Sequence, residues 1–204
     1  RLSAEQIRDQ ALCIAGIISN KMYGPGVMPY QPDGIWLSPW NGASWVQSKG
    51  EDQYRRAIYT YWKRSAAYPS MLNFDGVSRE VCTARRIRTN TPLQALNLMN
   101  DPTYIEAARH LALKMLNAAP TVPEQIQHGY RTLLAREASP PELRILTRAY
   151  ERSRTDFLAN PTATKGLLKA GTTIPDAKID PATLAALTSI ASTLLCLDET
   201  VTKE

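Results

Sequence analysis

Histidine, cysteine and phenylalanine are scarce in this chain of 204 residues, which contains 2, 3 and 2 of them. The cysteines at 13, 82 and 196 lie far apart and form no C-x-x-C pair. The sequence therefore argues against a zinc site or a covalently attached haem within this chain. One disulfide stays possible. For Cys13 and Cys196, which lie in apolar helical patterns, buried thiols are the favoured interpretation.

Several catalytic and membrane signatures are missing as well. No apolar run approaches the roughly 18 residues of a membrane span. The chain has no Gly-rich phosphate loop and no G-x-S-x-G elbow. His110 and His128 belong to no H-E-x-x-H motif, so we expect solvated helix histidines rather than haem ligands or bases. The chain begins at Arg1 without a signal-peptide pattern, which suggests a fragment or a processed chain.

The net charge of +5 is unevenly distributed along the chain. Residues 1–88 carry 12 basic and 7 acidic side chains, whereas residues 89–204 carry 12 of each. An excess of this size is mild for a nucleic-acid-binding protein, and no nucleic-acid-binding motif is present. We therefore expect no nucleic-acid partner, and we expect partners to meet the basic first part of the chain.

The first 90 residues combine one helix with irregular chain. Ser3 and Gln6 form a capping box, which predicts a helix that ends near residues 19–20. Residues 20–50 are rich in proline, glycine and tryptophan, and we expect an ordered loop there because disordered segments are poor in aromatic residues. Residues 51–64 suggest a short helix that enters an extended aromatic segment.

Proline-marked amphipathic helices dominate the rest of the chain. Apolar side chains recur at helical spacing after the prolines at 92, 102, 123, 140 and 181, while residues 165–178 resemble a surface connection. The predicted fold is mainly α: an irregular helical bundle with a long ordered Trp/Pro/Gly-rich loop and at most a short β element. We expect one continuous domain, with a first part at 1–90, the bundle at 91–204, and further domains elsewhere in a larger protein.

The run from 74 to 96, FDGVSREVCTARRIRTNTPLQAL, is distinctive. With segments 1–9, 50–56, 99–102 and 194–199, it resembles an uncharacterised C-terminal domain family of planctomycete-type exported cytochrome c proteins. The chain departs from that family at Cys196, where asparagine is commoner, and at Thr200, where an aromatic residue is commoner. The resemblance implies a periplasmic or otherwise exported protein, with a haem c domain elsewhere in the full-length chain. It supplies no catalytic residues.

The centre of that run holds the candidate site residues Asp75, Arg79, Arg85, Arg86 and Arg88. Arginine forks suit carboxylates, sulfates and phosphates, so one interpretation is an anion site. The favoured alternative is a partly buried ion-pair network in which Asp75 and Glu80 pair with Arg79 and Arg86. Arg85 and Arg88 lack such a neighbour in the sequence and are the better ligand candidates.

Trp36, Trp40 and Trp45 form the second candidate site. Their flat rings could stack on sugars or frame a haem edge. The favoured alternative is that they fill the core beneath the long loop.

Two functional hypotheses follow from the sequence. In the first, the chain is a non-catalytic helical scaffold or interaction module of an exported haem-linked redox protein, binds no cofactor itself, and docks against the rest of its own polypeptide or a redox partner subunit. In the second, it is a ligand-binding or catalytic module for extracellular polysaccharide or another anionic substrate. Arg85, Arg86 and the Trp-rich loop would then line a cleft.

Overall fold

The computed structural model describes residues 1–35, 44–174 and 178–203. This part of the chain contains nine α-helices, and its β structure consists of two isolated bridges, Ser19 with Arg55 and Val27 with Thr60. The mainly α fold class is therefore confirmed. The helices are α1 (Ala4–Ala15), α2 (Pro69–Asn73), α3 (Pro92–Asn100), α4 (Pro102–Ala118), α5 (Val122–Leu134), α6 (Pro140–Ala159), α7 (Pro161–Leu168), α8 (Pro181–Leu195) and α9 (Asp198–Val201).

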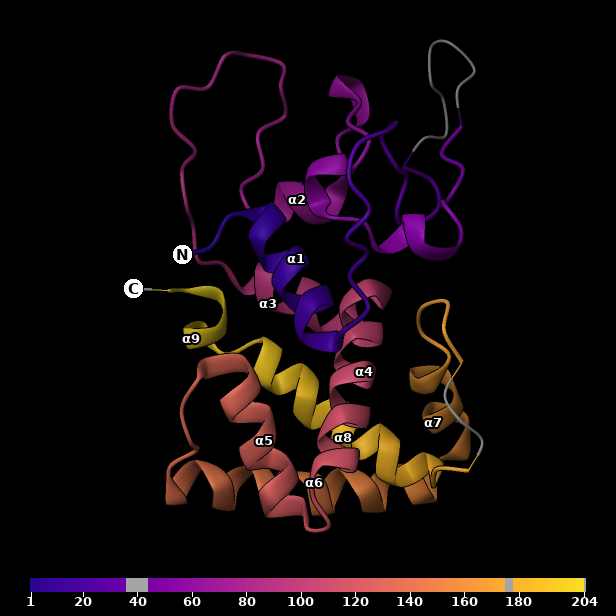
Figure 1. Cartoon of the computed structure of the whole chain (residues 1–204), viewed down its shortest axis with the longest axis vertical. Helices are drawn as coiled ribbons and strands as arrows, with labels where there is room; N and C mark the ends of the chain where they lie inside the picture. Colours follow the sequence, from indigo (N-terminus) through magenta and orange to yellow (C-terminus); the bar gives the residue numbers. More distant parts are fainter. Residues whose placement is uncertain (36–43, 175–177, 204) are drawn as a thin grey trace.

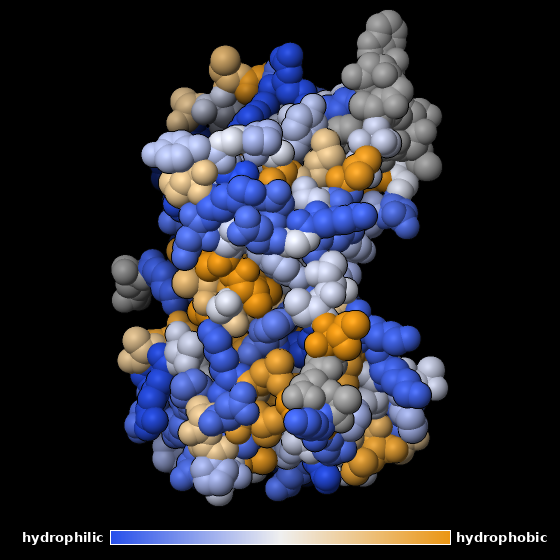
Figure 2. Space-filling view, turned by 45° about the vertical axis from the view of Figure 1, so that its right-hand side comes forward, coloured by the Kyte–Doolittle hydropathy of each residue, from blue (hydrophilic) through white to orange (hydrophobic). Residues whose placement is uncertain are grey.

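Figure 1 shows two unlike regions. Helices α4 to α8 pack together in the lower part, while α1, α2 and irregular chain form the upper part, with α3 between them. The space-filling view in Figure 2 shows a narrowing between these regions, around which apolar side chains gather, and mostly polar side chains elsewhere on that face. We refer below to residues 1–90 as the loop region and to residues 91–203 as the helical region.

The core of the helical region lies between α4 and α8. Leu111 and Met115 of α4 and Leu187 and Leu194 of α8 are completely buried. Both helices also bury alanines, which allow their backbones to approach closely. Gly129 of α5 has the same effect, because a Cβ there would stand only 2.9 Å from Leu194 Cδ1. Burial of this apolar surface is the main stabilising contribution of the region.

Proline and capping residues start these helices as the sequence predicts. Each of α2 to α8 has proline in its first or second position, and Ser139 forms a capping box with Glu142 at α6. One prediction here is wrong: α7 extends to Leu168, into the stretch expected to be a surface connection. Asn160 caps α7, which at eight residues is too short to show a clear apolar period.

Two predictions for the loop region also need correction. Helix α1 ends at Ala15 rather than near residue 19, because Gly16 takes a left-handed conformation (φ 77°) and its N–H bonds back to the helix. Residues 51–64 form no α-helix; they form 3₁₀ turns at Gly50–Tyr54, Ala57–Tyr59 and, at their end, Arg64–Ala66.

Two buried arginines fix the irregular chain of the loop region. Arg8 of α1 donates to the carbonyl oxygens of Arg55 and Gln53, each at 2.8 Å. Arg55, which is 1% exposed, donates to the carbonyl oxygens of Lys21, Tyr23 and Pro25 at 3.3, 2.5 and 3.1 Å. Backbone carbonyls without partners would be costly to bury, so each arginine satisfies several at once.

Trp45 lies partly buried beneath the same loop. Its Nε1 donates to Pro29 O at 2.9 Å, and its ring stacks on Tyr68 with the centroids 6.0 Å apart. Trp45 therefore packs against the core, in line with the favoured interpretation for the tryptophans. Trp36 and Trp40 lie outside the described residues.

The cysteines differ from expectation. Cys13 is exposed, so its predicted burial is wrong, and Cys196 is half-buried; burial raises the pKa of the Cys196 thiol to about 11. All three thiols are free in the structure. Within the described residues, no helix is both long and apolar enough to cross a membrane.

Candidate functional site

The distinctive run of the sequence forms a long exposed loop that starts where α2 ends. Asp75 has a left-handed backbone (φ 62°), Gly76 N donates to Met71 O at 2.8 Å, and Asp75 N donates to Leu72 O at 3.0 Å. This pattern is a Schellman motif, in which aspartate takes the position usually held by glycine. A Cβ at Gly76 would collide with Met71 O at 2.7 Å, so the turn requires glycine there.

The carboxylate of Asp75 closes the base of this loop. It accepts hydrogen bonds from Thr89 N at 2.7 Å and from Thr89 Oγ1 at 2.8 Å. Gln94 of α3, which is 1% exposed, donates to the same carboxylate at 3.3 Å. Asp75 thus joins the two ends of the segment 76–88, which we call the arginine loop.

Residues 79–88 of the arginine loop are exposed throughout. Val81 and Ile87 are 74% and 78% exposed, so apolar and cationic side chains share one surface. Arg79 lies over the ring of Trp62, with its guanidinium carbon 5.4 Å from the ring centroid. That contact holds the start of the loop against the body of the protein.

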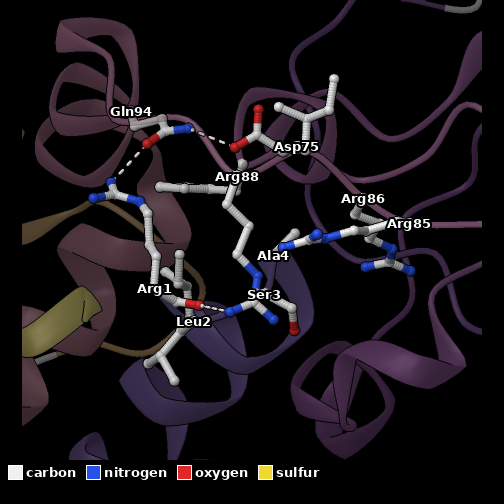
Figure 3. A pocket seen from close by; sticks show the side chains of 12 residues that line it. Arg1, Leu2, Ser3, Ala4, Asp75, Arg85, Arg86, Arg88 and Gln94 are labelled. Carbon is white, nitrogen blue, oxygen red and sulfur yellow. Dashed lines mark hydrogen bonds between the residues drawn. The ribbon is translucent and has the colours of Figure 1, made fainter. Parts of the chain in front are cut away.

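A cleft of about 900 Å³ lies between the arginine loop, the start of α1 and Gln94. Arg85, Arg86 and Arg88 line it from the loop, and Arg1 lines it from the opposite wall. Figure 3 shows Arg88 reaching the main chain of Arg1, and Gln94 lying between Arg1 and Asp75. Four of the twelve lining residues are therefore arginines, against the single acidic residue Asp75.

The four arginines have different partners. Arg86 forms an ion pair with Glu5 of α1 at 2.7 Å. Burial acts to raise the pKa of Glu5, but the hydrogen bond and charge of Arg86 outweigh it and leave that pKa lowered. Arg1 donates to Gln94 Oε1 at 2.6 Å and also lies 3.5 Å from the exposed carboxylate of Asp198.

Arg85 and Arg88 carry charge that no carboxylate offsets within the described residues. Arg88 donates to the carbonyl oxygen of Arg1 at 2.7 Å, which orients its guanidinium without neutralising it. Arg85 lines the cleft and has no hydrogen bond or ion pair with another described residue. These are the two arginines that the sequence singled out as ligand candidates.

The predicted ion-pair network within the run is wrong. Asp75 bonds to Thr89 and Gln94 rather than to an arginine, and Arg86 pairs with Glu5, far away in the sequence. Sequence proximity suggested the wrong partners because the loop extends away from α2 and returns beside α1. The segment is also exposed rather than partly buried.

The cleft suits an anion that carries a planar or branched group of oxygens. Guanidinium forks bind carboxylates and sulfates through paired hydrogen bonds. The start of α1 lies in the same wall and adds the positive end of a helix dipole. Sequence reasoning missed Arg1 and Gln94, since their role depends on contacts across 93 residues that no local pattern encodes.

The described residues contain no group of three or more His, Cys, Asp or Glu side chains placed to hold a metal ion. The haem c inferred from the resemblance is a prediction about another part of the full-length protein.

Comparison with known proteins places the chain in one family. A family model described as "Protein of unknown function (DUF1553)", PSD1, matches residues 1–150. No curated protein and no solved structure matches the chain. The matched residues include α1, the arginine loop, α3 and every residue that lines the cleft. Because the match covers well over half of its length, the chain belongs to the PSD1 family of proteins of unknown function.

Proposed function

We propose that this chain is a non-catalytic interaction module whose arginine cleft binds an acidic segment of a partner protein or of the rest of its own polypeptide. The observation that carries the proposal is the pair Arg85 and Arg88, which face a cleft of about 900 Å³ without a carboxylate partner among the described residues. A charged side chain left unpaired beside a cleft is available to a ligand at little cost in broken ion pairs.

The surface around the cleft supports a protein partner. Val81 and Ile87 expose most of their apolar surface beside the arginines. Protein interfaces are enriched in arginine and in apolar side chains, whereas sulfated polymers offer few apolar groups to such residues. Trp45, which would be needed for sugar stacking in the Trp-rich loop, instead packs against Tyr68.

The setting of this module is a further proposal, which rests on the resemblance alone. We infer that it works in an exported or periplasmic protein, linked to a haem c domain or to a redox partner subunit. Purification of the native chain together with a haem-containing polypeptide would support that setting. Its recovery as an isolated monomer would count against it.

A titration tests the binding proposal. A fluorescent hexaglutamate peptide should bind the chain, and binding should weaken as sodium chloride is raised, since salt screens exposed charges. Replacing Arg85 and Arg88 together by glutamine should reduce the affinity by about tenfold or more, because charge-assisted hydrogen bonds are lost. The unfolding free energy should hardly change, as both side chains are exposed.

Arg144 and Arg148 of α6 provide a matched control. Both are exposed, and Figure 1 shows their helix at the end of the helical region that lies away from the loop region. Replacing them by glutamine removes the same net charge without touching the cleft. An equal loss of affinity in both double variants would mean that peptide binding depends only on the net charge of the protein, and the proposal would fail. Tighter binding of a sulfated oligosaccharide through Arg85 and Arg88 would instead favour the polysaccharide hypothesis.

A further inference from the structure

A second cavity, of about 360 Å³, lies away from the arginine cleft, where the loop region meets the helical region. Tyr30, Gln47, Gln53 and Tyr54 line it from the first, and Glu106 of α4 and the turn after α7 line it from the second. Apart from Pro102, Ala170 and Gly171, all lining side chains are polar or aromatic. The volume is within the range of small-molecule pockets.

Glu106 is the central group of this cavity, because the residue is only 1% exposed and yet contributes to the cavity wall. Its Oε1 accepts from Tyr54 Oη at 3.0 Å, from Thr172 N at 2.9 Å, and from Thr173 N and Oγ1 at 2.7 Å each. Among the described residues, Oε2 receives no hydrogen bond. One oxygen is therefore fully used by the protein, and the other still has acceptor capacity.

Gly171 packs closely against the side chain of Glu106, in a turn that only glycine can form there. Its backbone is left-handed (φ 84°), and a Cβ at this position would lie 2.4 Å from Glu106 Oε2. Any other residue would both strain the turn and occupy the space beside the carboxylate.

The charges around the cavity favour a neutral ligand. Arg109 Nη2 lies 3.5 Å from Glu106 Oε1 and is itself buried, so its positive charge partly neutralises that of the carboxylate. Lys169 adds a cation at the lining. Burial raises the pKa of Tyr54, which keeps its phenol protonated at neutral pH. A cationic ligand would meet these positive charges, and an anionic one would meet Glu106.

We propose that this cavity binds a neutral sugar unit. A hydroxyl group would donate to Glu106 Oε2, and a C–H face would lie on a tyrosine ring. The amides of Gln47 and Gln53 already bond to each other, and Gln53 Nε2 donates to Thr172 Oγ1 at 3.0 Å, so other hydroxyls would bond to the amide groups that these contacts leave over, such as Gln47 Oε1. Buried carboxylates and amides bind hydroxyl groups well, because such donors replace the water that the site gives up. This site is independent of the arginine cleft and of the acidic segment proposed for it.

Saturation-transfer NMR and calorimetry with glucose, galactose, mannose, xylose and N-acetylglucosamine test the proposal on the whole chain. At least one sugar should bind, and Glu106→Gln should weaken that binding by about tenfold, because the amide nitrogen replaces an acceptor with a donor. If Glu106→Gln destabilises the fold through Arg109, Gln47→Leu decides, with an expected loss of several-fold in affinity.

The double substitution of Arg85 and Arg88 by glutamine serves as the control and should leave sugar binding unchanged. The proposal is overturned if none of the five sugars binds at millimolar concentration. It is also overturned if a sugar binds wild type and Gln47→Leu equally, or if binding disappears with the arginine-cleft variant.

Discussion

In the helical region, Leu187 and Leu194 are buried among the side chains of neighbouring helices, whereas in the loop region Arg8 and Arg55 are buried among backbone carbonyls. The first region is stabilised by apolar contact, which regular helices provide once their backbone hydrogen bonds are satisfied internally. The second has little regular structure, so its carbonyl groups need outside donors, and a guanidinium supplies several. Irregular chain can therefore be as fixed as a helix when buried arginines hold it.

The arginine loop shows the opposite use of the same side chain. Arg55 is 1% exposed and gives its donors to Lys21, Tyr23 and Pro25, whereas Arg85 is exposed and bonds to none of the described residues. Buried arginines in this protein determine structure, and exposed ones beside the cleft are left for a ligand. Four experiments test what stabilises each of the two regions, from the largest expected effect to the smallest.

Leu187→Ala should lower the unfolding free energy by about 2–5 kcal/mol, since it leaves a cavity in the completely buried centre of α8. Urea denaturation measures the change. The matched control is Leu158→Ala on α6, where the leucine is 53% exposed and the change should be about 0.5 kcal/mol or less. Similar losses in both variants would contradict an apolar core centred on α4 and α8.

Arg55→Met should lower the free energy of unfolding by about 3 kcal/mol, because three partly buried hydrogen bonds from the guanidinium to carbonyl oxygens are lost while the apolar stem is kept. Thermal unfolding and limited proteolysis should show loosening within residues 20–60. Arg56→Met, at the exposed neighbouring position, breaks only a 3.5 Å ion pair with Asp9 and should cost less than about 1 kcal/mol. If Arg55→Met leaves the free energy of unfolding unchanged, buried arginines do not stabilise the irregular chain of the loop region.

Asp75→Gly should lower the free energy of unfolding by about 1 kcal/mol. Glycine keeps the left-handed turn at the end of α2, so the change isolates the loss of the carboxylate that joins Thr89 and Gln94. Amide exchange in the arginine loop should become faster, and the affinity for the hexaglutamate peptide should fall by a few-fold. Unchanged exchange in that loop would show that Asp75 does not hold its base.

The smallest effect concerns pH. Burial, followed by the charge of Arg109, lowers the pKa of His110, which bonds to Thr173 Oγ1 at 2.8 Å. Below the ordinary histidine pKa of about 6.5 the unfolded chain therefore binds more protons than the folded one, so stability should decrease as pH falls from 7 toward 5. His110→Gln should make that decrease shallower. A steeper decrease in the variant would reverse the sign and refute the assignment.

The parts of this fold that could be predicted from the sequence are those determined locally. Proline, a capping residue and an apolar period marked α3 to α6 and α8 because each acts within one or two turns of its own helix. Helix α7 has only eight residues, too few to show a clear apolar period. The apolar residues Ile17 and Ile18 continue the pattern of α1 beyond Gly16, although the left-handed backbone of Gly16 ends the helix.

The charged residues of the run predicted which side chains form the candidate site, but the sequence predicted only part of its geometry. Six charged residues crowd a short run, which indicates the arginines. Arg85 and Arg88 lack acidic neighbours in the sequence, and neither has a carboxylate partner among the described residues. Their surroundings could not be predicted. Glu5, Arg1 and Gln94 reach the cleft from segments far away in the sequence. The hydrogen bonds from Arg8 and Arg55 go to backbone carbonyl groups, which every residue carries, so no pattern of side chains predicts them.

Hydrogen–deuterium exchange with and without the hexaglutamate peptide tests most directly whether the exposed arginines form the binding surface. Exchange should be slower in residues 76–90 and at the start of α1 when the peptide is bound, with no change in α6. This protection should disappear when Arg85 and Arg88 are replaced by glutamine. Protection confined to other segments, or protection that survives the double substitution, would contradict this prediction.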